Sequence, residues 1–502
     1  MKSVKLFLFI ILIKAFFFIG CNDFYHDLSL NFNKRDLFDS KITSFSFHPD
    51  ENPNIDAEIE GRINHKTNKI FIIAPAGTGI SGMKINPRFT SSGIVYVKGK
   101  IQKSGSNRHM YNNPLKYEVI SANEVNRKVY TVTVLEHDSK IFVNHLSSGG
   151  GNGSSWDNAF NSLREAAELA SLFPDKKMKE IWIAAGTYKP DGIDNYFLLS
   201  ANTSFIGGFA GNESDVNARD ISANKTIISG NLGNGQFSGN LFGIFDENIS
   251  NIIEKDITFD GIEFTDANSS AEEGVRKHGA AINAFLSSDA ALKIVNCEFT
   301  NLSGGAVFAL DGNTIIINTS FQNITANDNF GAVHISGERA DITNSNFLDI
   351  EGSALSIFGS IINISDTGFK NITCTGNQAL YVTASEYVII KNSTIDNVVS
   401  GRGIYATSYK SLLITDSSIT NCEITGHGGG IYLNNFGRAE ISFITLNNVA
   451  ADIGSGIYYI GINDTYNSSL LLMNILISGA YIYDYPHPQM HLIGNNISIS
   501  VQ

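Results

Sequence analysis

Residues 297–308 read CEFTNLSGGAVF, and six later stretches repeat its internal order, from SFQNI at 320–324 to TLNNV at 445–449. Each copy has an anchor (Phe, Ile or Leu), then Asn or Asp two residues later, and a small residue before another apolar pair. The anchors are Phe299, Phe321, Phe347, Phe369, Ile395, Ile419 and Leu446. Subtraction gives steps of 22, 26, 22, 26, 24 and 27 residues. A unit of this length cannot bury a core by itself, so the copies must stack.

Stacked copies predict columns of equivalent residues, because successive coils of a parallel β-helix lie about 4.8 Å apart. We expect the anchors to form a buried column with each side chain flat against its neighbours. The residues two positions further on predict a structural ladder of side chains that bond to one another and to turn backbone. The ladder consists of Asn301, Asn323, Asp349, Asn371, Asn397, Asn421 and Asn448. Glycines such as Gly304 and Gly403 allow a positive φ at a corner.

Four motifs precede the repeats in the order SSWDNAF, EIWIAAGTYKP, FIGGFAG and TIISG, between residues 154 and 230. This order resembles the N-terminal part of a widespread family of right-handed parallel β-helices, in which an amphipathic helix caps the open end. An apolar stripe with helical spacing, preceded by Ser and Asp residues that can cap it, predicts such a helix. The stripe consists of Ala159, Leu163, Ala166, Ala167 and Ala170.

The repeats between about residues 255 and 480 also resemble those of polymorphic outer membrane proteins, which combine a GGA(I/V/L) element with F-x-x-N. Residues 304–307 read GGAV and match the first element, whereas residues 299–301 read Phe-x-Asn in place of the second. Because the chain stops soon after the last repeat, we expect a lipid anchor rather than the autotransporter route of that family.

The first 20 residues predict a lipoprotein signal peptide. Two lysines precede the apolar run 6–13, and residues 18–21 (FIGC) resemble a bacterial lipobox with Phe18 at its first position. Cys21 would then carry a lipid that anchors the chain to the membrane, and the alternative is a plain secretory signal that contains a cysteine. Residues 21–40 predict a tether. The expected location is the cell envelope, as a surface-exposed outer-membrane lipoprotein.

Residues 41–138 contain about seven short apolar runs separated by turn signals, which predicts a β-sandwich. The phrases FSFHPDENP, IFIIAPAGT and YEVISANEVNRKVYTVTV resemble an immunoglobulin-like module of bacterial surface lipoproteins, where it acts as a spacer. The glycine-rich stretch at 146–155 predicts a flexible linker.

Composition excludes some functions. A net charge of −13 makes nucleic acid an unsuitable partner, because phosphate contacts need a cationic face. Cys297, Cys374 and Cys422 lie at different phases of the repeat, and no CxxC or Cys/His spacing supports zinc. We therefore interpret them as small buried apolar residues. No cofactor is implied.

Many β-helices are polysaccharide lyases or hydrolases, so an enzyme is an alternative. The triplet at 426–428 (GHG) matches a short element of polygalacturonases, but neither an Asp pair nor a following Arg-x-Lys accompanies it. It falls where other copies carry a corner glycine, which favours a structural role. Asp341, Asp349 and Asp366 occupy different phases and do not form a calcium cluster. The sequence predicts no catalytic or metal-binding residue.

In each copy the corner is followed by one apolar residue and then by a position that is aromatic in most copies. It is occupied by Phe308, His334, Ser356, Tyr381, Tyr405, Tyr432 and Tyr458. If the preceding Leu or Ile faces inward, strand alternation sends the four tyrosines outward as an exposed column. Sugars bind such rings through their apolar faces, with the hydroxyl groups adding hydrogen bonds. The alternative is that stacked tyrosines only stabilise the sheet.

The sequence therefore predicts an all-β protein: a β-sandwich at 41–138, then a right-handed parallel β-helix at 139–502 with an N-terminal capping helix. We expect a lipid-anchored, non-enzymatic surface protein that binds glycans or proteins on a host or neighbouring cell. The alternative is a polysaccharide lyase or glycoside hydrolase on the same fold, which a carboxylate cluster on one face would distinguish. A purely structural envelope component is a third possibility.

Overall fold

The computed structural model describes residues 38–478 apart from short segments, together with three short strands beyond residue 478. The segments that it does not cover are 76, 137–139, 149–150, 175–178, 193–194, 245–251, 327–329, 375–377, 436, 454 and 462–468. The predicted signal peptide, Cys21 and the tether up to residue 37 also lie outside the described residues.

The chain forms two compact units. Of the described residues, the first unit holds 38–72, 83–111 and 115–133, and the second holds 73–82, 112–114 and those from 134 onward. Each unit has its own sheets, which the next paragraphs describe separately.

The N-terminal part consists of a three-stranded sheet (order β2-β1-β5) and a six-stranded sheet (order β3-β4-β9-β8-β6-β7). Their strands are β1 (Ile42–Phe47), β2 (Ile59–Glu60), β3 (Arg62–Asn64), β4 (Lys69–Ala74), β5 (Pro87–Ser91), β6 (Gly93–Val97), β7 (Lys100–Ile101), β8 (Leu115–Ser121) and β9 (Arg127–Glu136). Phe45 on β1 and Tyr117 on β8 meet edge to face with ring centres 5.2 Å apart, so the core joins the two sheets. The predicted β-sandwich is confirmed, with nine described strands instead of about seven.

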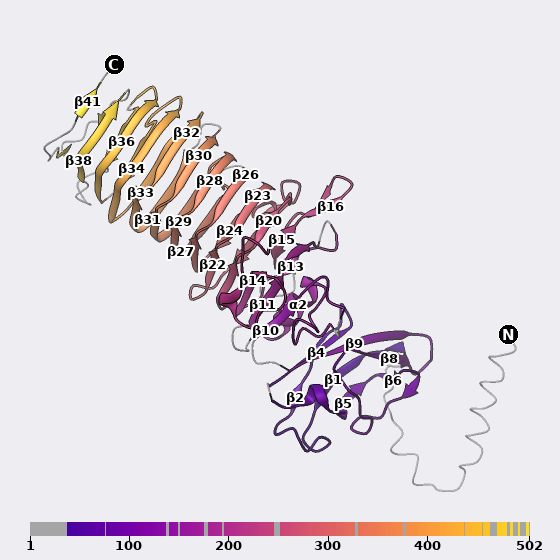
Figure 1. Ribbon diagram of the computed structural model, residues 1–502. Coiled ribbons are helices and arrows are strands. Elements are labelled where there is room, and N and C mark those ends of the chain that lie inside the picture. Colours follow the sequence, from indigo (N-terminus) through magenta and orange to yellow (C-terminus); the bar gives the residue numbers. More distant parts are fainter. Residues whose placement is uncertain are drawn as a thin grey trace, which may run out of the picture. The chain divides into compact units, whose positions relative to one another are not determined.

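The second unit is a parallel β-solenoid, as the sequence predicts. One sheet network of 30 strands runs from β10 (Lys140–Val143) to β41 (Ser498–Ser500), and Figure 1 shows the strands of successive coils lying side by side. Pairing is parallel over this network, with Phe299 opposite Phe321 and Phe321 opposite Phe347, and the register shifts within the pairs β11–β14 and β29–β31. The solenoid is of the right-handed type.

Its strands form three runs along the solenoid. The first run is β10, β11 (Lys179–Ala184), β14 (Thr203–Phe209), β19 (Ile257–Asp260), β22 (Ala291–Val295), β25 (Asn313–Ile317), the second halves of β27 (Val333–Thr343), β29 (Leu355–Ser365) and β31 (Gln378–Lys391), the first halves of β34 (Ser411–Glu423), β36 (Arg438–Ala450) and β38 (Ser469–Ser478), and β40 (Met490–His491).

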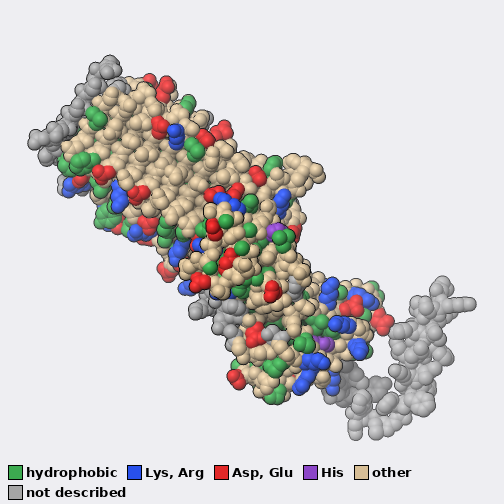
Figure 2. Space-filling view, viewed as in Figure 1, with side chains coloured by type: hydrophobic (Ala, Val, Ile, Leu, Met, Phe, Trp, Pro, Cys, Tyr) green, Lys and Arg blue, Asp and Glu red, His purple; other side chains and the backbone are tan. Residues whose placement is uncertain are grey.

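The second run holds the anchors: β12 (Gly186–Tyr188), β15 (Thr226–Ser229), β20 (Glu263–Thr265), β23 (Glu298–Ser303), β26 (Ser320–Thr325), β28 (Asn346–Glu351), β30 (Gly368–Thr373), β32 (Thr394–Val399), the second halves of β34, β36 and β38, and β41. Figure 2 shows few charged side chains on the face in view over β28 to β36.

The third run is β13 (Phe197–Leu198), β18 (Phe242–Gly243), β21 (Ile282–Phe285), β24 (Val307–Leu310), the first halves of β27, β29 and β31, then β33 (Arg402–Ser408), β35 (Ile431–Asn435), β37 (Ile457–Gly461) and β39 (Ile482–Asp484). A small antiparallel hairpin, β16 (Asn231–Gly233) with β17 (Gln236–Phe237), and three 3₁₀ turns (Ile80–Gly82, Val216–Ala218 and Gly274–Lys277) complete the described elements.

The anchor column is buried and stacked, as predicted. The rings of Phe299 and Phe321 have centres 4.8 Å apart and planes inclined by 9°, and Phe321 and Phe347 are 4.5 Å apart at 7°. Phe264, one coil before the first predicted anchor, extends the column at 4.7 Å from Phe299. All of these rings are buried, as are the aliphatic anchors of the later coils.

The Asn column lies at a bend in the second run. Side-chain amides donate along it, from Asn323 to Asn301 (3.3 Å) and from Asn397 to Asn371 (2.9 Å). The ladder is interrupted twice among the described residues. No bond joins Asn323 to Asp349, and Asn421 donates to Asp396 Oδ1 (2.8 Å) in place of Asn397. The remaining contacts join Asn371 to Asp349 and Asn448 to Asn421, both at 2.8 Å. Every ladder residue has a positive φ, from 51° to 61°, a conformation that Asn and Asp tolerate better than other residues with a Cβ atom.

A second column of residues with a left-handed backbone conformation (positive φ) lies three residues before the anchors. We call it the second left-handed column, and the sequence analysis did not single it out. It consists of Asn296, Asn318, Asn344, Asp366, Asn392, Asp416 and Phe443. Asn318 donates to Asn296 (3.2 Å) and Asn344 to Asn318 (2.5 Å), so it forms a second side-chain ladder. Most corners of the solenoid are therefore made by Asn and Asp. The predicted positive φ of the corner glycine occurs at Gly304 but not at Gly403.

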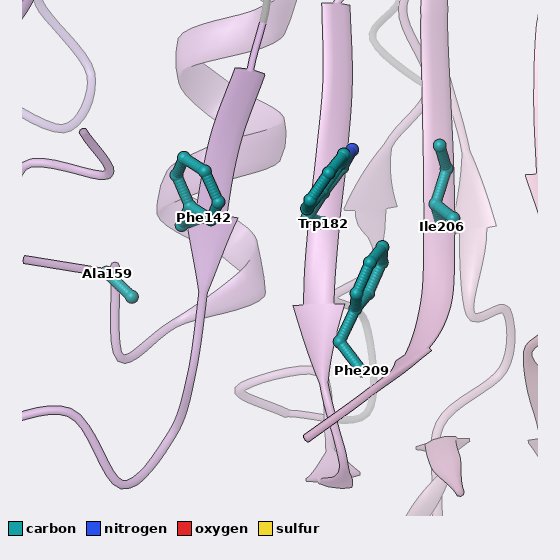
Figure 3. Packing of buried hydrophobic residues seen from close by; sticks show 5 residues of the cluster. All are labelled: Phe142, Ala159, Trp182, Ile206 and Phe209. Atoms are coloured by element: carbon teal, nitrogen blue, oxygen red, sulfur yellow. The ribbon is translucent and has the colours of Figure 1, made fainter. Parts of the chain in front are cut away.

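The start of the solenoid is closed by α2 (Leu163–Leu172), which packs on β10, β11 and β13 and confirms the predicted capping helix. Ala159 lies before this helix instead of within its stripe. It joins a cluster with Phe142, Trp182, Ile206 and Phe209, in which Trp182 and Phe209 stack at 4.6 Å (Figure 3). Ser162 occupies the N-cap position without a side-chain capping bond.

Part of the predicted flexible linker is ordered and packs against neighbouring residues. The backbone of Gly153 bonds to Phe142 and Asn158, and a Cβ atom at Gly153 would lie 2.5 Å from the ring of Phe160. Glycine is needed at position 153 for close approach as well as for its φ of 78°, so this glycine reflects packing and not flexibility.

The three cysteines after residue 21 are free and buried, as the sequence predicts. Burial raises the pKa of each thiol to about 12, which keeps them neutral and unreactive.

Candidate ligand-binding surface

The tyrosine column lies on the outer side of the third run. Parallel register places Tyr381, Tyr405, Tyr432 and Tyr458 on successive coils of β31, β33, β35 and β37. The residues before them, Leu380, Ile404, Ile431 and Ile457, are buried as the predicted inward set. Strand alternation therefore directs the tyrosines away from the interior.

Exposure along this column is uneven. Tyr381, Tyr405 and Tyr432 are half-buried, but Tyr458 is only 5% exposed, so the prediction of four exposed rings is wrong for Tyr458. The ring of His427, from the loop between β34 and β35, lies 4.7 Å from that of Tyr458. Strand periodicity predicts the direction of a side chain and does not predict a loop that folds over it.

The rings stack on one another. Tyr381 and Tyr405 are 5.0 Å apart at 7°, Tyr405 and Tyr432 are 5.0 Å apart at 12°, and Tyr432 and Tyr458 are 5.1 Å apart at 28°. Both faces of Tyr405 and Tyr432 are thus covered by neighbouring rings, which does not fit binding of a sugar to those faces. Such rings present their edges and hydroxyl groups instead. Within the described part of the chain, the hydroxyls of Tyr381, Tyr405 and Tyr432 have no hydrogen-bond partner.

Arg402, at the start of β33, lies against the same column. Its guanidinium carbon is 5.1 Å from the ring centre of Tyr432 and 5.9 Å from that of Tyr405, within cation–π range. Nη1 donates to Gln378 Oε1 (3.0 Å), and Nε donates to the backbone oxygen of His427 (3.4 Å). Among the described residues no carboxylate pairs with Arg402.

Burial lowers the pKa of Arg402 from its usual value, and the groups that oppose this effect are Tyr432, Tyr405 and Cys374. Burial also raises the pKa of Tyr432. At neutral pH the phenol of Tyr432 is therefore neutral and lies beside one guanidinium cation.

The column continues toward the N-terminus with a buried aromatic group. His334 stacks on Phe308 at 5.1 Å and 18° and is 5% exposed. Burial, aided by His278, lowers the pKa of His334 to about 4, so the ring is neutral at physiological pH. This part of the column belongs to the packing of the coils.

The triplet at 426–428 lies in the loop before the corner and not at the corner itself. Ile404 pairs with Ile431 and Ile431 with Ile457, so Gly430 is the residue equivalent to Gly403 and Gly456. His427 is half-buried, and its carbonyl oxygen supports Arg402. The sequence comparison therefore placed the triplet at the wrong point of the coil.

A carboxylate pair that the sequence analysis missed lies on the second run. Glu263 and Glu298 face each other on adjacent strands, one residue before Phe264 and Phe299. Lys225 Nζ lies 2.6 Å from Glu298 Oε1. Burial raises the pKa of Glu263, and Glu298 and Asp266 raise it further. The pair was missed because the repeats were counted from Phe299, although a Glu-Phe dipeptide occurs at both positions.

No helix among the described residues is long and apolar enough to cross a membrane. No group of three or more His, Cys, Asp or Glu side chains in the described ranges is placed to hold a metal ion.

No protein-family model matches the chain, and no curated protein matches it. The resemblance to polymorphic outer membrane proteins and to immunoglobulin-like modules therefore stays a prediction. Among solved structures, the chain is similar to the catalytic unit of a thermostable GH87 alpha-1,3-glucanase from Streptomyces thermodiastaticus strain HF3-3. The identity is 11% over 89% of this chain and 86% of that chain, with a TM-score of 0.31. A TM-score of that size gives no basis for transferring an activity.

Proposed function

We propose that this protein is a non-enzymatic ligand-binding scaffold that binds glycans through Tyr381, Tyr405, Tyr432 and Arg402. The observation that carries the proposal is the row of three phenolic hydroxyls that have no partner in the described part of the chain and whose rings lie about one strand spacing apart. A hydroxyl both donates and accepts hydrogen bonds, so such a row can bind the repeated hydroxyls of a linear sugar chain.

The competing interpretation is that the column only stabilises the solenoid. Stacked aromatic pairs contribute about 0.5–1.5 kcal/mol each beyond the area that they bury. The same packing could be achieved with phenylalanine, because the hydroxyls have no partner among the described residues. The retention of the polar hydroxyl at three successive positions favours binding over packing alone.

We place this surface on the outside of the cell as part of the same proposal. Cys21 would carry the lipid after removal of residues 1–20, residues 21–40 would act as a tether, and the immunoglobulin-like unit would act as a spacer. These features favour an outer-membrane lipoprotein that adheres to a host or neighbouring cell. Metabolic labelling with a radioactive fatty acid tests the anchor, and a Cys21→Ser variant should lose the label.

A glycan array tests the binding surface. The full chain should bind, and the double variant Tyr405→Phe/Tyr432→Phe should bind about tenfold or more weakly, because each lost hydrogen bond contributes about 0.5–1.5 kcal/mol. Tyr387→Phe is the matched control, since Tyr387 is an exposed tyrosine on the first run of the same solenoid. Binding that is unchanged in the double variant would rule out the hydroxyl row.

An enzyme remains the second candidate, and the pair Glu263 and Glu298 favours it. Glycoside hydrolases use two carboxyl groups, one protonated through a raised pKa and one ionised. Burial raises the pKa of Glu263, whereas Lys225 pairs with Glu298. Release of reducing or unsaturated sugar by the full chain, abolished in Glu263→Gln and Glu298→Gln, would replace the scaffold by a hydrolase or lyase.

A further inference from the structure

Arg402 has no acidic partner among the described residues, in a protein of net charge −13. Some other cations of the same solenoid have acidic partners: Arg438 contacts Glu440 at 3.1 Å and Lys293 contacts Asp256 at 2.7 Å. Arg402 is half-buried, whereas Arg438 is exposed, yet the two hydrogen bonds of Arg402 go to neutral oxygens of Gln378 and His427. Partial burial of an uncompensated charge is unfavourable, so this arrangement needs a reason.

The guanidinium retains free donors. Arginine has five N–H groups, and the two bonds to Gln378 and His427 use one on Nη1 and the one on Nε. Both hydrogens of Nη2 and the second hydrogen of Nη1 have no partner in the described part of the chain. These two nitrogens form the planar fork that pairs with both oxygens of a carboxylate.

The fork lies beside the tyrosine row. Gln378 and the His427 backbone hold it from the two adjacent coils, while the rings of Tyr405 and Tyr432 lie within 6 Å of its carbon atom. The guanidinium is therefore fixed before a ligand arrives, which reduces the entropy lost on binding. A sugar chain along the hydroxyls of Tyr405 and Tyr432 would pass the fork.

We infer that the glycan is acidic and that Arg402 binds the carboxylate of a uronic or sialic acid residue. This inference rests on the proposed function, since it assigns the class of sugar bound by the same surface. The carboxylate supplies the missing counter-ion of Arg402, and the adjacent sugar hydroxyls bond to the tyrosine hydroxyls. No bond is made or broken in this binding.

The test is an array of matched pairs probed with the full chain. Oligogalacturonate, alginate and hyaluronan oligosaccharides and sialyllactose are each printed beside the methyl ester of their carboxyl groups. A heparin fragment and a sulfated neutral sugar complete the set. We expect one or more acids to bind about tenfold to a hundredfold more tightly than the ester, as for a hydrogen bond to a charged group. Binding should weaken as salt is raised.

Substitutions of Arg402 test whether this residue causes the preference for the acid over its ester. Arg402→Gln should remove the preference for the acid over its ester. Arg402→Lys keeps the charge and loses the fork, so this variant should retain part of the preference for the acid. It also provides a test if the Arg402→Gln variant does not fold. Arg438→Gln is the control, because Arg438 is an exposed arginine on the first run.

The outcomes separate the two proposals. Equal binding of acid and ester, lost in Tyr405→Phe/Tyr432→Phe, overturns the acidic assignment and leaves the glycan-binding surface in place. Binding of the sulfated neutral sugar without any carboxylated sugar also overturns the carboxylate assignment. Absence of binding to every printed glycan, acidic or neutral, overturns the proposed function together with this inference.

Discussion

Two stacks of aromatic rings run along this solenoid, one inside and one outside. The inner stack of Phe299, Phe321 and Phe347 has ring spacings of 4.5–4.8 Å, and the outer stack of Tyr381, Tyr405 and Tyr432 has a spacing of 5.0 Å. The inner rings are fully buried, whereas the outer rings are half-buried. Parallel register stacks any side chain that recurs at one position, so stacking alone does not distinguish a core from a surface.

The two stacks overlap in one copy of the repeat, because Phe369 stacks on Phe347 at 5.0 Å and is followed in the same copy by Tyr381. In the next three copies the anchor is Ile395, Ile419 or Leu446, and the outer position is Tyr405, Tyr432 or Tyr458. Those coils are already filled by aliphatic anchors, so the tyrosines are not needed to fill the core. The difference indicates that the inner stack serves stability and that the outer stack is available for another role.

The largest expected effect is on the inner stack. Phe347→Ala should lower the free energy of unfolding by about 3–5 kcal/mol, because it leaves a cavity between two buried rings. Tyr405→Ala should cost only about 1–2 kcal/mol, since it removes ring contacts at a half-buried site. Urea unfolding followed by circular dichroism compares the two. Equal losses would mean that the outer stack is as much a part of the core as the inner one.

The burial and stacking of the inner rings were predictable from the sequence, whereas the exposure of the outer rings was not. The step of 22–27 residues and the order Phe-x-Asn fix the register, and register fixes every column. The burial of Tyr458 depends on the path of the loop that carries His427, and the spacing of the repeats does not predict that path. The pairing of Glu263 with Glu298 was accessible in principle, since both precede an anchor phenylalanine.

The second prediction concerns the buried end of the outer column. His334 has a pKa lowered from 6.5 to about 4 by burial, so between these values the unfolded chain binds a proton that the folded chain does not. Stability should therefore fall as the pH is lowered from about 6.5 to about 4, by about 3 kcal/mol in total. Urea midpoints measured across this range should show a smaller fall in His334→Gln. An identical pH dependence in both proteins would mean that His334 is hydrated.

The smallest effect concerns Phe443, which lies in the second left-handed column. It has a φ of 54° and is 56% exposed, at a position that is Asn or Asp in the other coils. A bulky residue in this conformation costs about 1–2 kcal/mol, so Phe443→Asn should raise stability by about 1 kcal/mol. Phe358→Asn, at an exposed strand position without a positive φ, should give no gain. A lower thermal midpoint for Phe443→Asn would show that its ring makes a stabilising contact.

The most direct test of the central claim measures glycan binding and unfolding on the same samples. The two variants are Tyr405→Phe/Tyr432→Phe in the outer stack and Ile395→Val in the inner column. The account predicts that the tyrosine variant loses binding with an unchanged unfolding midpoint, and that the isoleucine variant loses stability with unchanged binding. Loss of stability without loss of binding in the tyrosine variant would contradict this account. It would mean that the outer stack only stabilises the solenoid.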